Sequence, residues 1–288
     1  MLYDMLLQGL YFADDLHAFR SFDESVDNGV VTDACKRCQS SLHDWGAANQ
    51  VEFDPAKESI HVMSLTKGDG SSFPLLGAVF DSDLSMQTLF LQLRTTCKWK
   101  IARIRCTKAF HTRRDQLHVF QVKIWSYLEY RTSVIYHCNY ELLGDLDALQ
   151  TNFLCSLRIT REVAALQYNF LPLNTRRDIA MLGLLHRAKL GSGPSHFGKF
   201  FKRQGDTRWL QNPFCNPPYS FGPYNRVLPI VKHSALGLIP VYNSLDNATL
   251  DLRSVSEFQT ALTEYIKSQI RIGLRTWDVS LSPRHFGH

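Results

Sequence analysis

Two adjacent carboxylates, Asp14 and Asp15, are the residues of this sequence whose types and spacing most directly suggest chemistry. They stand between two short apolar segments, 6–13 and 16–19, which predicts a tight β-hairpin with the carboxylates at its turn. Because like charges so close repel, a cation usually compensates such a pair, and Mg²⁺ prefers oxygen ligands. A rigid hairpin suits a phosphoryl-transfer site, in which two metal ions lie about 3.5–4 Å apart. By itself, the pair is more typical of a solvated turn.

Four further elements are expected to position this hairpin. The first is a helix that directs Cys38 inward and ends at Gly46. Two short strands and a second hairpin, which turns around Gly77, follow it. The expected helix, strands and hairpin cover residues 32–46, 51–53, 60–63 and 73–81.

After residue 83 the apolar residues follow a helical period. A hydroxyl residue followed three positions later by an acidic one indicates a helix start. This spacing occurs at Thr112 and Asp115, at Thr175 and Asp178, and at Ser254 and Glu257. Residues 191–233 are rich in Gly, Pro, Asn and aromatic residues, which predicts an irregular connection.

These patterns predict an α+β chain with a small β-containing part followed by a mainly α-helical part. The 288 residues suit one large domain or two small ones. Hydrophobic residues make up 44% and charged residues 20%, which excludes a disordered tail, a collagen-like chain and a coiled coil.

Charge is divided unevenly along the chain. Residues 1–92 contain 14 acidic and 5 basic side chains, a net charge of −9, whereas residues 93–288 contain 27 basic and 13 acidic ones, a net charge of +14. The asymmetry suggests an acidic part that holds cations and a basic part that meets a polyanion. Ordinary variation of surface charge between subdomains explains it equally well.

Neither a membrane span nor a framework of disulfide bonds is expected. No stretch reaches the roughly 18 consecutive apolar residues of a membrane span, so we expect no membrane partner. No basic region precedes the first apolar run, so we expect no signal peptide. Seven cysteines, scattered singly except for Cys35 and Cys38, predict a reducing compartment. Zinc binding at this pair is not expected, because His43 is the only nearby third ligand.

Between Arg94 and Arg114 the sequence carries eight basic side chains and no acidic one. Arg94, Lys98 and Arg105 fall on one face of the predicted helix. Such a face predicts sequence-independent, salt-dependent contacts with nucleic-acid phosphates; the alternative is a solvated helix face. The eight candidate nucleic-acid-binding residues are Arg94, Lys98, Lys100, Arg103, Arg105, Lys108, Arg113 and Arg114.

In this context Phe12–Asp15 resembles the aromatic-x-Asp-Asp motif of reverse transcriptases, which lies on the same kind of hairpin. Residues 48–59 resemble the segment whose lysine lies near the incoming nucleotide, and Phe73–Asp81 resembles the hairpin that grips the primer end. The basic helices resemble the thumb of non-LTR (LINE-type) retrotransposon polymerases, and residues 173–186 and 236–243 resemble the C-terminal region of such elements. The resemblance covers most of the chain and depends on the order and spacing of the motifs.

The resemblance implies a role for each matching residue. Asp14 would be the main ligand, and Asp15 an auxiliary carboxylate, of a two-metal Mg²⁺ site. Lys57 would face the pyrophosphate leaving group as a positive charge or proton donor, although without the resemblance it reads as an ordinary turn lysine. Leu76 and Gly77 would position the primer through their backbone, and Gly77 would allow close approach.

The resemblance also implies the organisation of the chain. It assigns four regions: the C-terminal part of a polymerase palm, a helical thumb-like region, an irregular Pro/Gly-rich connection and a C-terminal helical segment. They cover residues 1–82, 83–190, 191–235 and 236–288.

The implied reaction is synthesis of DNA on an RNA template, with an RNA template, a DNA primer and deoxynucleoside triphosphates as partners. Family members carry upstream a further metal-binding aspartate and the fingers, and neither precedes Met1 in this sequence. We therefore expect an incomplete Mg²⁺ site and no polymerisation by this chain alone. Two alternatives stay open: a non-catalytic nucleic-acid-binding remnant and an unrelated α+β interaction domain.

Overall fold

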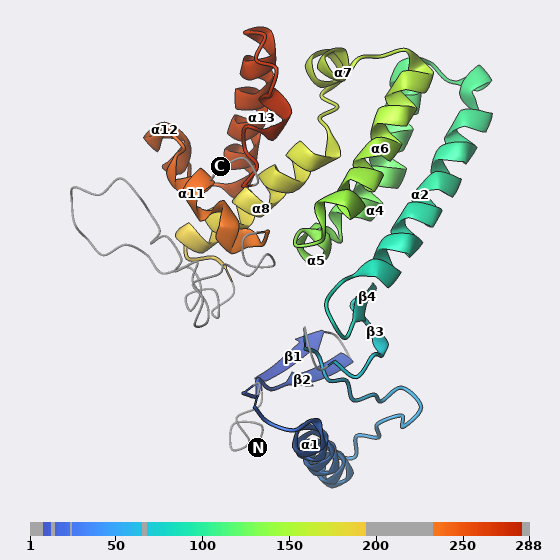
Figure 1. The fold of residues 1–288 in the computed structure, drawn as a ribbon, viewed down its shortest axis with the longest axis vertical. Helices are drawn as coiled ribbons and strands as arrows, with labels where there is room; N and C mark the ends of the chain where they lie inside the picture. The colour runs from blue at the N-terminus through green and yellow to red at the C-terminus, as the bar shows by residue number, and fades with distance from the viewer. Residues whose placement is uncertain (1–7, 13–14, 24, 65–67, 194–232, 284–288) are drawn as a thin grey trace. The chain divides into compact units, whose positions relative to one another are not determined.

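The computed structural model describes residues 8–12, 15–23, 25–64, 68–193 and 233–283 (Figure 1). Helices dominate, and the strands form two separate two-stranded antiparallel sheets. The predicted α+β class is therefore confirmed, whereas the assignment to a polymerase palm stays a prediction. The chain divides into two compact units, residues 1–86 and residues 87–288.

The first hairpin consists of β1 (Gln8–Phe12) and β2 (Asp15–Phe19). The strands are antiparallel, and their register runs from the Gln8–Phe19 pair to the Phe12–Asp15 pair. The hairpin predicted around the two aspartates is confirmed. Asp14 itself lies outside the described residues.

The helix α1 (Asn28–Ala48) is longer than predicted because it begins at a capping residue that the pattern did not reveal. The carboxylate of Asp27 accepts a hydrogen bond from the backbone N–H of Gly29 at 2.7 Å. Gly46, the predicted stop, instead lies inside the helix and is buried. A Cβ atom there would come within 2.6 Å of the carbonyl oxygen of Val51. Glycine is therefore needed for close packing of the following segment, not for ending the helix.

The strands predicted at 51–53 and 60–63 do not form. The backbone N–H of Val62 donates to Oδ2 of Asp69 at 3.0 Å, and the Val62 carbonyl accepts from the Asp69 N–H at 3.2 Å. An aspartate thus satisfies backbone groups that a strand would offer to a neighbouring strand. The second predicted hairpin does form, from β3 (Ser72–Leu75) and β4 (Ala78–Asp81).

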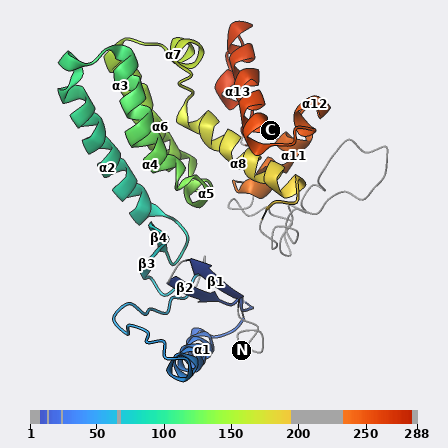
Figure 2. The ribbon, with the colours of Figure 1, turned by 180° about the vertical axis from the view of Figure 1, so that it is seen from behind.

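The larger unit is helical, and Figures 1 and 2 show α2, α3–α4 and α6 side by side as an up-down-up layer, with α8 and α13 packed against each other next to it. Its elements are α2 (Gln87–Cys106), the 3₁₀ turn η2 (Lys108–Phe110), α3 (Arg113–Phe120), the π-helical turn η3 (Gln121–Trp125), α4 (Ser126–Glu129), α5 (Thr132–Ile135), α6 (Tyr140–Leu157), α7 (Arg161–Tyr168), α8 (Leu173–Lys189), η4 (Ala235–Leu238), α11 (Ile239–Asn243), α12 (Asn247–Leu250), α13 (Val255–Arg271) and η5 (Trp277–Val279).

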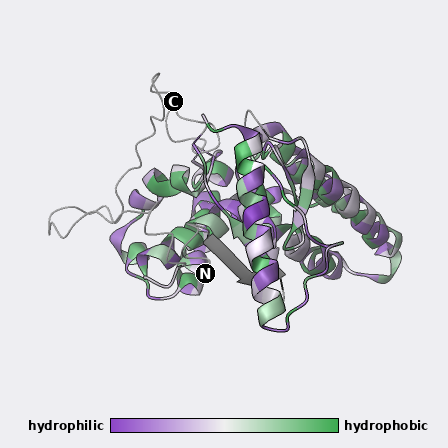
Figure 3. Ribbon diagram, turned by 90° about the horizontal axis from the view of Figure 1, so that it is seen from below, coloured by the Kyte–Doolittle hydropathy of each residue, from purple (hydrophilic) through white to green (hydrophobic). Residues whose placement is uncertain are grey.

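The apolar stripe of α2 forms one side of the first core. Its buried residues are those that the helical period predicts: Leu89, Phe90, Leu93, Cys97, Ile101 and Ile104. The rings of Phe120 on α3 and Phe153 on α6 stack with centroids 4.7 Å apart, so all three helices share this core. Hydrophilic and hydrophobic residues are interspersed along the helices (Figure 3), and none of the described helices has the length and apolar character needed to cross a membrane.

A second core joins α8 to the C-terminal helices around His186, which is fully buried. Its Nε2 lies 2.8 Å from the carbonyl oxygen of Leu252, and its Nδ1 lies 2.8 Å from the hydroxyl of Tyr242. Because a carbonyl can only accept, Nε2 carries the proton and Nδ1 accepts from the tyrosine. The ring also stacks on Phe258 at 4.1 Å. Neutral His186 therefore connects α8 to α11, to α13 and to the segment between α12 and α13.

The predicted helix starts are confirmed at Thr112, which forms a capping box, and at Ser254, whose side chain accepts two backbone hydrogen bonds. The third predicted helix start, at Thr175, is wrong, because α8 begins at Leu173. The Thr175 hydroxyl donates to the carbonyl oxygen of Asp278 at 3.0 Å, and Asp178 accepts from the Tyr136 hydroxyl at 2.6 Å. Both side chains anchor α8 to distant parts of the unit instead of capping it.

Stability of the chain should fall in mild acid because of His186. Burial lowers the pKa of His186 from its ordinary 6.5, so as the pH falls the unfolded state takes up a proton first. The contribution of His186 to the free energy of unfolding is complete above pH 6.5 and is lost as the pH falls below that value towards the lowered pKa. Urea titrations followed by circular dichroism between about pH 8 and pH 5 measure this loss.

The control is His186→Phe, which cannot take up a proton. Since the substitution leaves the Leu252 carbonyl without its donor, we expect a loss of about 1–3 kcal/mol at neutral pH. The stability of the variant should also depend less on pH than that of the unchanged chain. An equal pH dependence in both proteins would contradict the assignment to His186.

Candidate nucleic-acid interface

The two carboxylates expected to bind metal are Asp14 and Asp15. Asp15 begins β2 opposite Phe12, and Asp14 lies outside the described residues. Within the described part of the chain, no three His, Cys, Asp or Glu side chains lie together as metal ligands. The Mg²⁺ site therefore stays a prediction that depends on the resemblance.

Lys57 lies in a turn that begins at Asp54. Its backbone N–H donates to the Asp54 carbonyl at 3.0 Å, and its Nζ lies 3.7 Å from Asp54 Oδ2. The lysine side chain is 84% exposed, and an ion pair so exposed contributes about 0–1 kcal/mol. Lys57 can therefore exchange this partner for another anion at little cost.

The neighbouring Glu58 fastens the Lys57 turn to α1. It accepts hydrogen bonds from Nε2 of His43, at 2.9 Å, and from the side-chain amide of Gln39. These bonds hold the pKa of Glu58 below its ordinary value, with His43 as the larger cause. Lys57 thus sits on a loop whose position α1 determines.

Leu76 and Gly77 form the two-residue turn between β3 and β4. Both have positive φ angles, +47° for Leu76 and +75° for Gly77, as a type I′ turn requires. The sequence prediction of a tight turn at Gly77 is confirmed. A leucine in the left-handed region is strained, and its side chain is 44% exposed. Their proposed contact with a primer stays a prediction.

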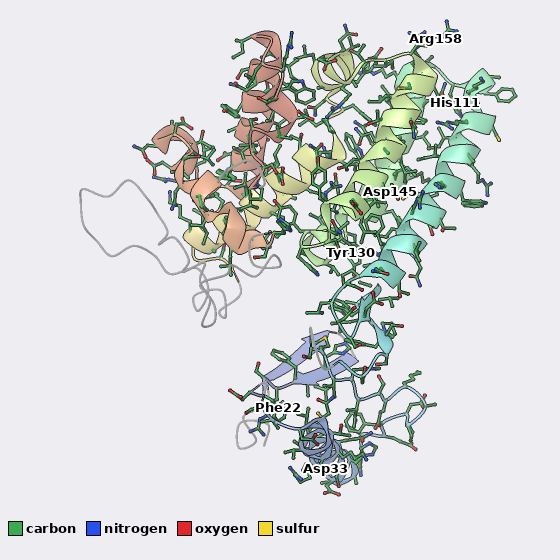
Figure 4. All side chains as sticks on the ribbon, viewed as in Figure 1. Phe22, Asp33, His111, Tyr130, Asp145 and Arg158 are labelled. Atoms are coloured by element: carbon green, nitrogen blue, oxygen red, sulfur yellow. The ribbon has the colours of Figure 1, made fainter. Side chains whose placement is uncertain are left out.

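The eight predicted basic residues all belong to α2, η2 and the start of α3. Three of them have partners inside the unit. Arg94 lies 3.3 Å from Asp145 of α6 (Figure 4), Arg105 donates to the carbonyl of Asn152 on α6 at 3.1 Å, and Lys100 donates to the carbonyl of Lys123 at 3.2 Å. Since Arg94 and Arg105 both reach α6, the face that they were predicted to share with Lys98 lies on the flank of α2 next to α6.

The other five basic side chains are exposed: Lys98, Arg103, Lys108, Arg113 and Arg114. The Arg103 guanidinium lies over the ring of Trp99, 4.8 Å from its centroid. Lys98 and Arg103 lie on α2, Lys108 lies on η2, and Arg113 and Arg114 lie at the start of α3. We call these five exposed residues of the larger unit the basic surface.

Aromatic residues beside these cations were not predicted from the sequence. Trp99 lies between Lys98 and Lys100 on α2, and Phe110 lies two residues after Lys108; they are 58% and 84% exposed. The ring of Tyr127 has Lys100 Nζ at 3.9 Å and Arg131 Cζ at 4.4 Å from its centroid. The sequence did hold a signal, because Trp99 lies off the apolar stripe of α2 and between two lysines. Cations interleaved with exposed aromatic rings are typical of nucleic-acid-binding surfaces.

The Cys35 and Cys38 pair lies on α1, away from any described cluster of metal ligands. Cys38 is buried, as predicted for an inward position, and Cys35 is half-buried. Burial raises the pKa of both thiols, so they stay protonated at neutral pH. His43, the nearby histidine, is occupied by Glu58.

Comparison with protein-family models, with curated proteins and with solved structures gives no match. The likeness to reverse transcriptases therefore depends on the motifs of this sequence and on their order.

Leu76→Asn should stabilise the second hairpin, because asparagine tolerates the left-handed conformation that strains leucine. We expect a gain of about 1 kcal/mol in the local opening free energy, which corresponds to about fivefold greater protection of the amides in Ser72–Asp81. Hydrogen exchange followed by mass spectrometry measures it. Gly77→Ala, at a φ of +75°, should reduce the protection, and a gain there would contradict the turn assignment.

Proposed function

We propose that this chain is the C-terminal part of an RNA-directed DNA polymerase of the non-LTR retrotransposon type, and that its larger unit binds an RNA–DNA duplex. The observation that carries the proposal is the basic surface. From residue 84 through residue 114 the sequence contains no acidic side chain, and six of the eight basic ones are exposed on α2, η2 and α3.

The size of the basic surface suits a nucleic-acid duplex. Residues 98–105 of α2 extend over about 10 Å, at about 1.5 Å per residue, and the turn to α3 adds three more exposed cations. A duplex carries about one charge per 1.7 Å of its axis, so several phosphates face a surface of this length. Arg94 adds to it, because its half-exposed ion pair with Asp145 is weak enough to exchange for a phosphate.

On this proposal the smaller unit contributes to the phosphoryl-transfer site. Asp14 and Asp15 would hold Mg²⁺, Lys57 would face the pyrophosphate of a deoxynucleoside triphosphate, and Leu76 and Gly77 would contact the primer end. The family carries a further metal-binding aspartate and the fingers in segments that precede these motifs. Synthesis therefore belongs to a longer chain, whereas duplex binding is a property of residues 87–288.

A second candidate function, nucleic-acid binding without catalysis, is favoured by the same basic surface. The two candidates differ only in whether Asp14 and Asp15 bind metal for synthesis. The third possibility, an interaction domain unrelated to nucleic acids, predicts no affinity for a duplex even at low salt.

The double variant Lys98→Ala/Arg103→Ala should bind an RNA–DNA duplex more weakly than the unchanged chain. For each cation removed from a phosphate, the slope of the logarithm of the binding constant against the logarithm of salt concentration should fall by about 1. Fluorescence anisotropy with a labelled duplex between about 50 and 200 mM salt measures both effects.

The matched control is Lys36→Ala/Arg37→Ala, which removes two exposed cations of α1 and leaves the basic surface unchanged. This variant should bind the duplex as the unchanged chain does. An equal decrease in affinity in the two variants would show that overall charge, rather than the basic surface, determines binding.

Asp14→Ala should reduce DNA synthesis to background in a chain that also contains the upstream polymerase segments, because a metal ligand is removed. Duplex affinity should stay within about twofold, since the basic surface is intact. Primer extension and anisotropy on the same protein separate the two effects. Asp33→Ala, which removes an exposed carboxylate of α1 (Figure 4), serves as control. Equal loss of synthesis and binding in Asp14→Ala would argue against a metal role.

A further inference from the structure

The connection between α2 and α3 presents an exposed aromatic ring. Every residue from 105 to 115 is exposed, and the side chain of Phe110 is 84% exposed, the highest value among the large hydrophobic residues of the described chain. Burying a phenylalanine ring away from water lowers the free energy of the protein, but nothing in the described unit covers this ring. We call residues 105–115 the tip.

Hydrogen bonds on both sides hold the tip in place. The backbone N–H of Phe110 donates to the Thr107 carbonyl at 3.0 Å, and the Thr107 hydroxyl donates to the Ile104 carbonyl at 3.0 Å. On the other side, Gln116 donates through its side-chain amide to the carbonyl of His111 at 3.2 Å, and the capping box fixes the start of α3. The ring is therefore presented by a fixed turn, so little conformational entropy is lost when a ligand covers it.

The charge around Phe110 is positive. Its basic neighbours are Arg105, Lys108, Arg113 and Arg114. The one carboxylate of the tip belongs to Asp115, which accepts from the N–H of Thr112 at 2.9 Å and from its hydroxyl at 2.7 Å. The hydrogen bonds from Thr112 lower the pKa of Asp115 and hold its negatively charged carboxylate within the capping box. His111 and Arg158 lie at the same end of the unit (Figure 4), which adds a further cation there.

A fixed aromatic ring among cations is complementary to an unpaired nucleotide. Bases inside a duplex are stacked on one another and cannot cover an outside ring. An unpaired base has a free face, and stacking it on an aromatic side chain strengthens binding about fivefold or more. The cations would contact the phosphates on either side of that base. A lipid surface fits less well, because interfacial binding needs a wide apolar face and the tip offers one ring among small and charged residues.

We propose that the tip binds the unpaired strand next to the duplex, with Phe110 stacked on a base and Lys108 and Arg113 on its phosphates. This inference rests on the proposed duplex binding by the basic surface, and it adds a second contact of different chemistry. The ligand class is single-stranded nucleic acid that continues from a duplex end.

The test uses the full chain and four labelled probes in anisotropy titrations: a blunt RNA–DNA duplex, the same duplex with an unpaired extension of the RNA strand, one with an unpaired extension of the DNA strand, and the unpaired strand alone. The unchanged chain should bind at least one extended duplex about fivefold or more tightly than the blunt one. Phe110→Ala should remove that preference and leave blunt-duplex affinity unchanged, whereas Phe110→Trp should keep it.

Two comparisons make the result specific. Leu91→Ala shortens another exposed side chain of α2, 62% exposed and far from the tip along the helix, and should keep the preference. Lys98→Ala should weaken binding to all three duplexes alike, because it acts on the shared duplex contact. Circular dichroism establishes that each variant is folded, as expected for substitutions of exposed residues.

The inference is overturned if Phe110→Ala binds all three duplexes as the unchanged chain does, or if its affinity for the blunt duplex falls to the same extent as for the extended ones. Phe110-dependent binding to vesicles of anionic phospholipid, without a preference for extended duplexes, would also overturn it and would identify a lipid contact. Failure of the unchanged chain to bind any duplex contradicts the proposed function. Phe110-dependent binding to the unpaired strand alone would in that case still support the tip.

Discussion

Burial of the apolar stripe of α2 is the constraint on which the arrangement of the larger unit depends. Leu89 and Ile104 mark the ends of that stripe, and its packing with α3 and α6 leaves α2 one possible rotation. Since a helix repeats every 3.6 residues, fixing the inward face also fixes which side chains point outward. The exposure of Lys98, Trp99 and Arg103 is thus a consequence of core packing. The hydrophobic core orients the cations, which contribute little to folding themselves.

The same packing changes how the eight basic residues between Arg94 and Arg114 are interpreted. Eight cations without an acidic residue suggest a uniform positive helix, yet α6 lies beside one flank and supplies partners to Arg94 and Arg105. The other exposed cations are Lys98 and Arg103 on α2 and Lys108, Arg113 and Arg114 at the turn into α3. Most of these cations lie close to Phe110, so charge and aromatic surface meet at one end of the unit. Local composition alone cannot reveal such a redistribution.

Features encoded by neighbouring residues could be predicted from the sequence, and features that need distant partners could not. The hairpin at Gly77 and the cap at Thr112 each depend on a few adjacent residues, and both were found. The start of α8 was misplaced because Thr175 bonds to Asp278, 103 residues away. The strands expected near Val62 failed for a related reason, since a loop aspartate satisfied the backbone. For the site, the sequence identified the cations but not their partners on α6.

The division of charge between the units has a chemical rationale under the proposed function. Residues 1–86 carry a net charge of −9 and residues 87–288 a net charge of +14. Template, primer and triphosphate are all polyanions, so carboxylates near them repel the substrates unless divalent cations intervene. An acidic unit therefore needs a neighbour that holds the duplex by its phosphates while metal ions neutralise the reacting centre. On the proposed function a basic unit alone would suffice for binding, so affinity for a duplex and synthesis of DNA would be separable properties of these residues.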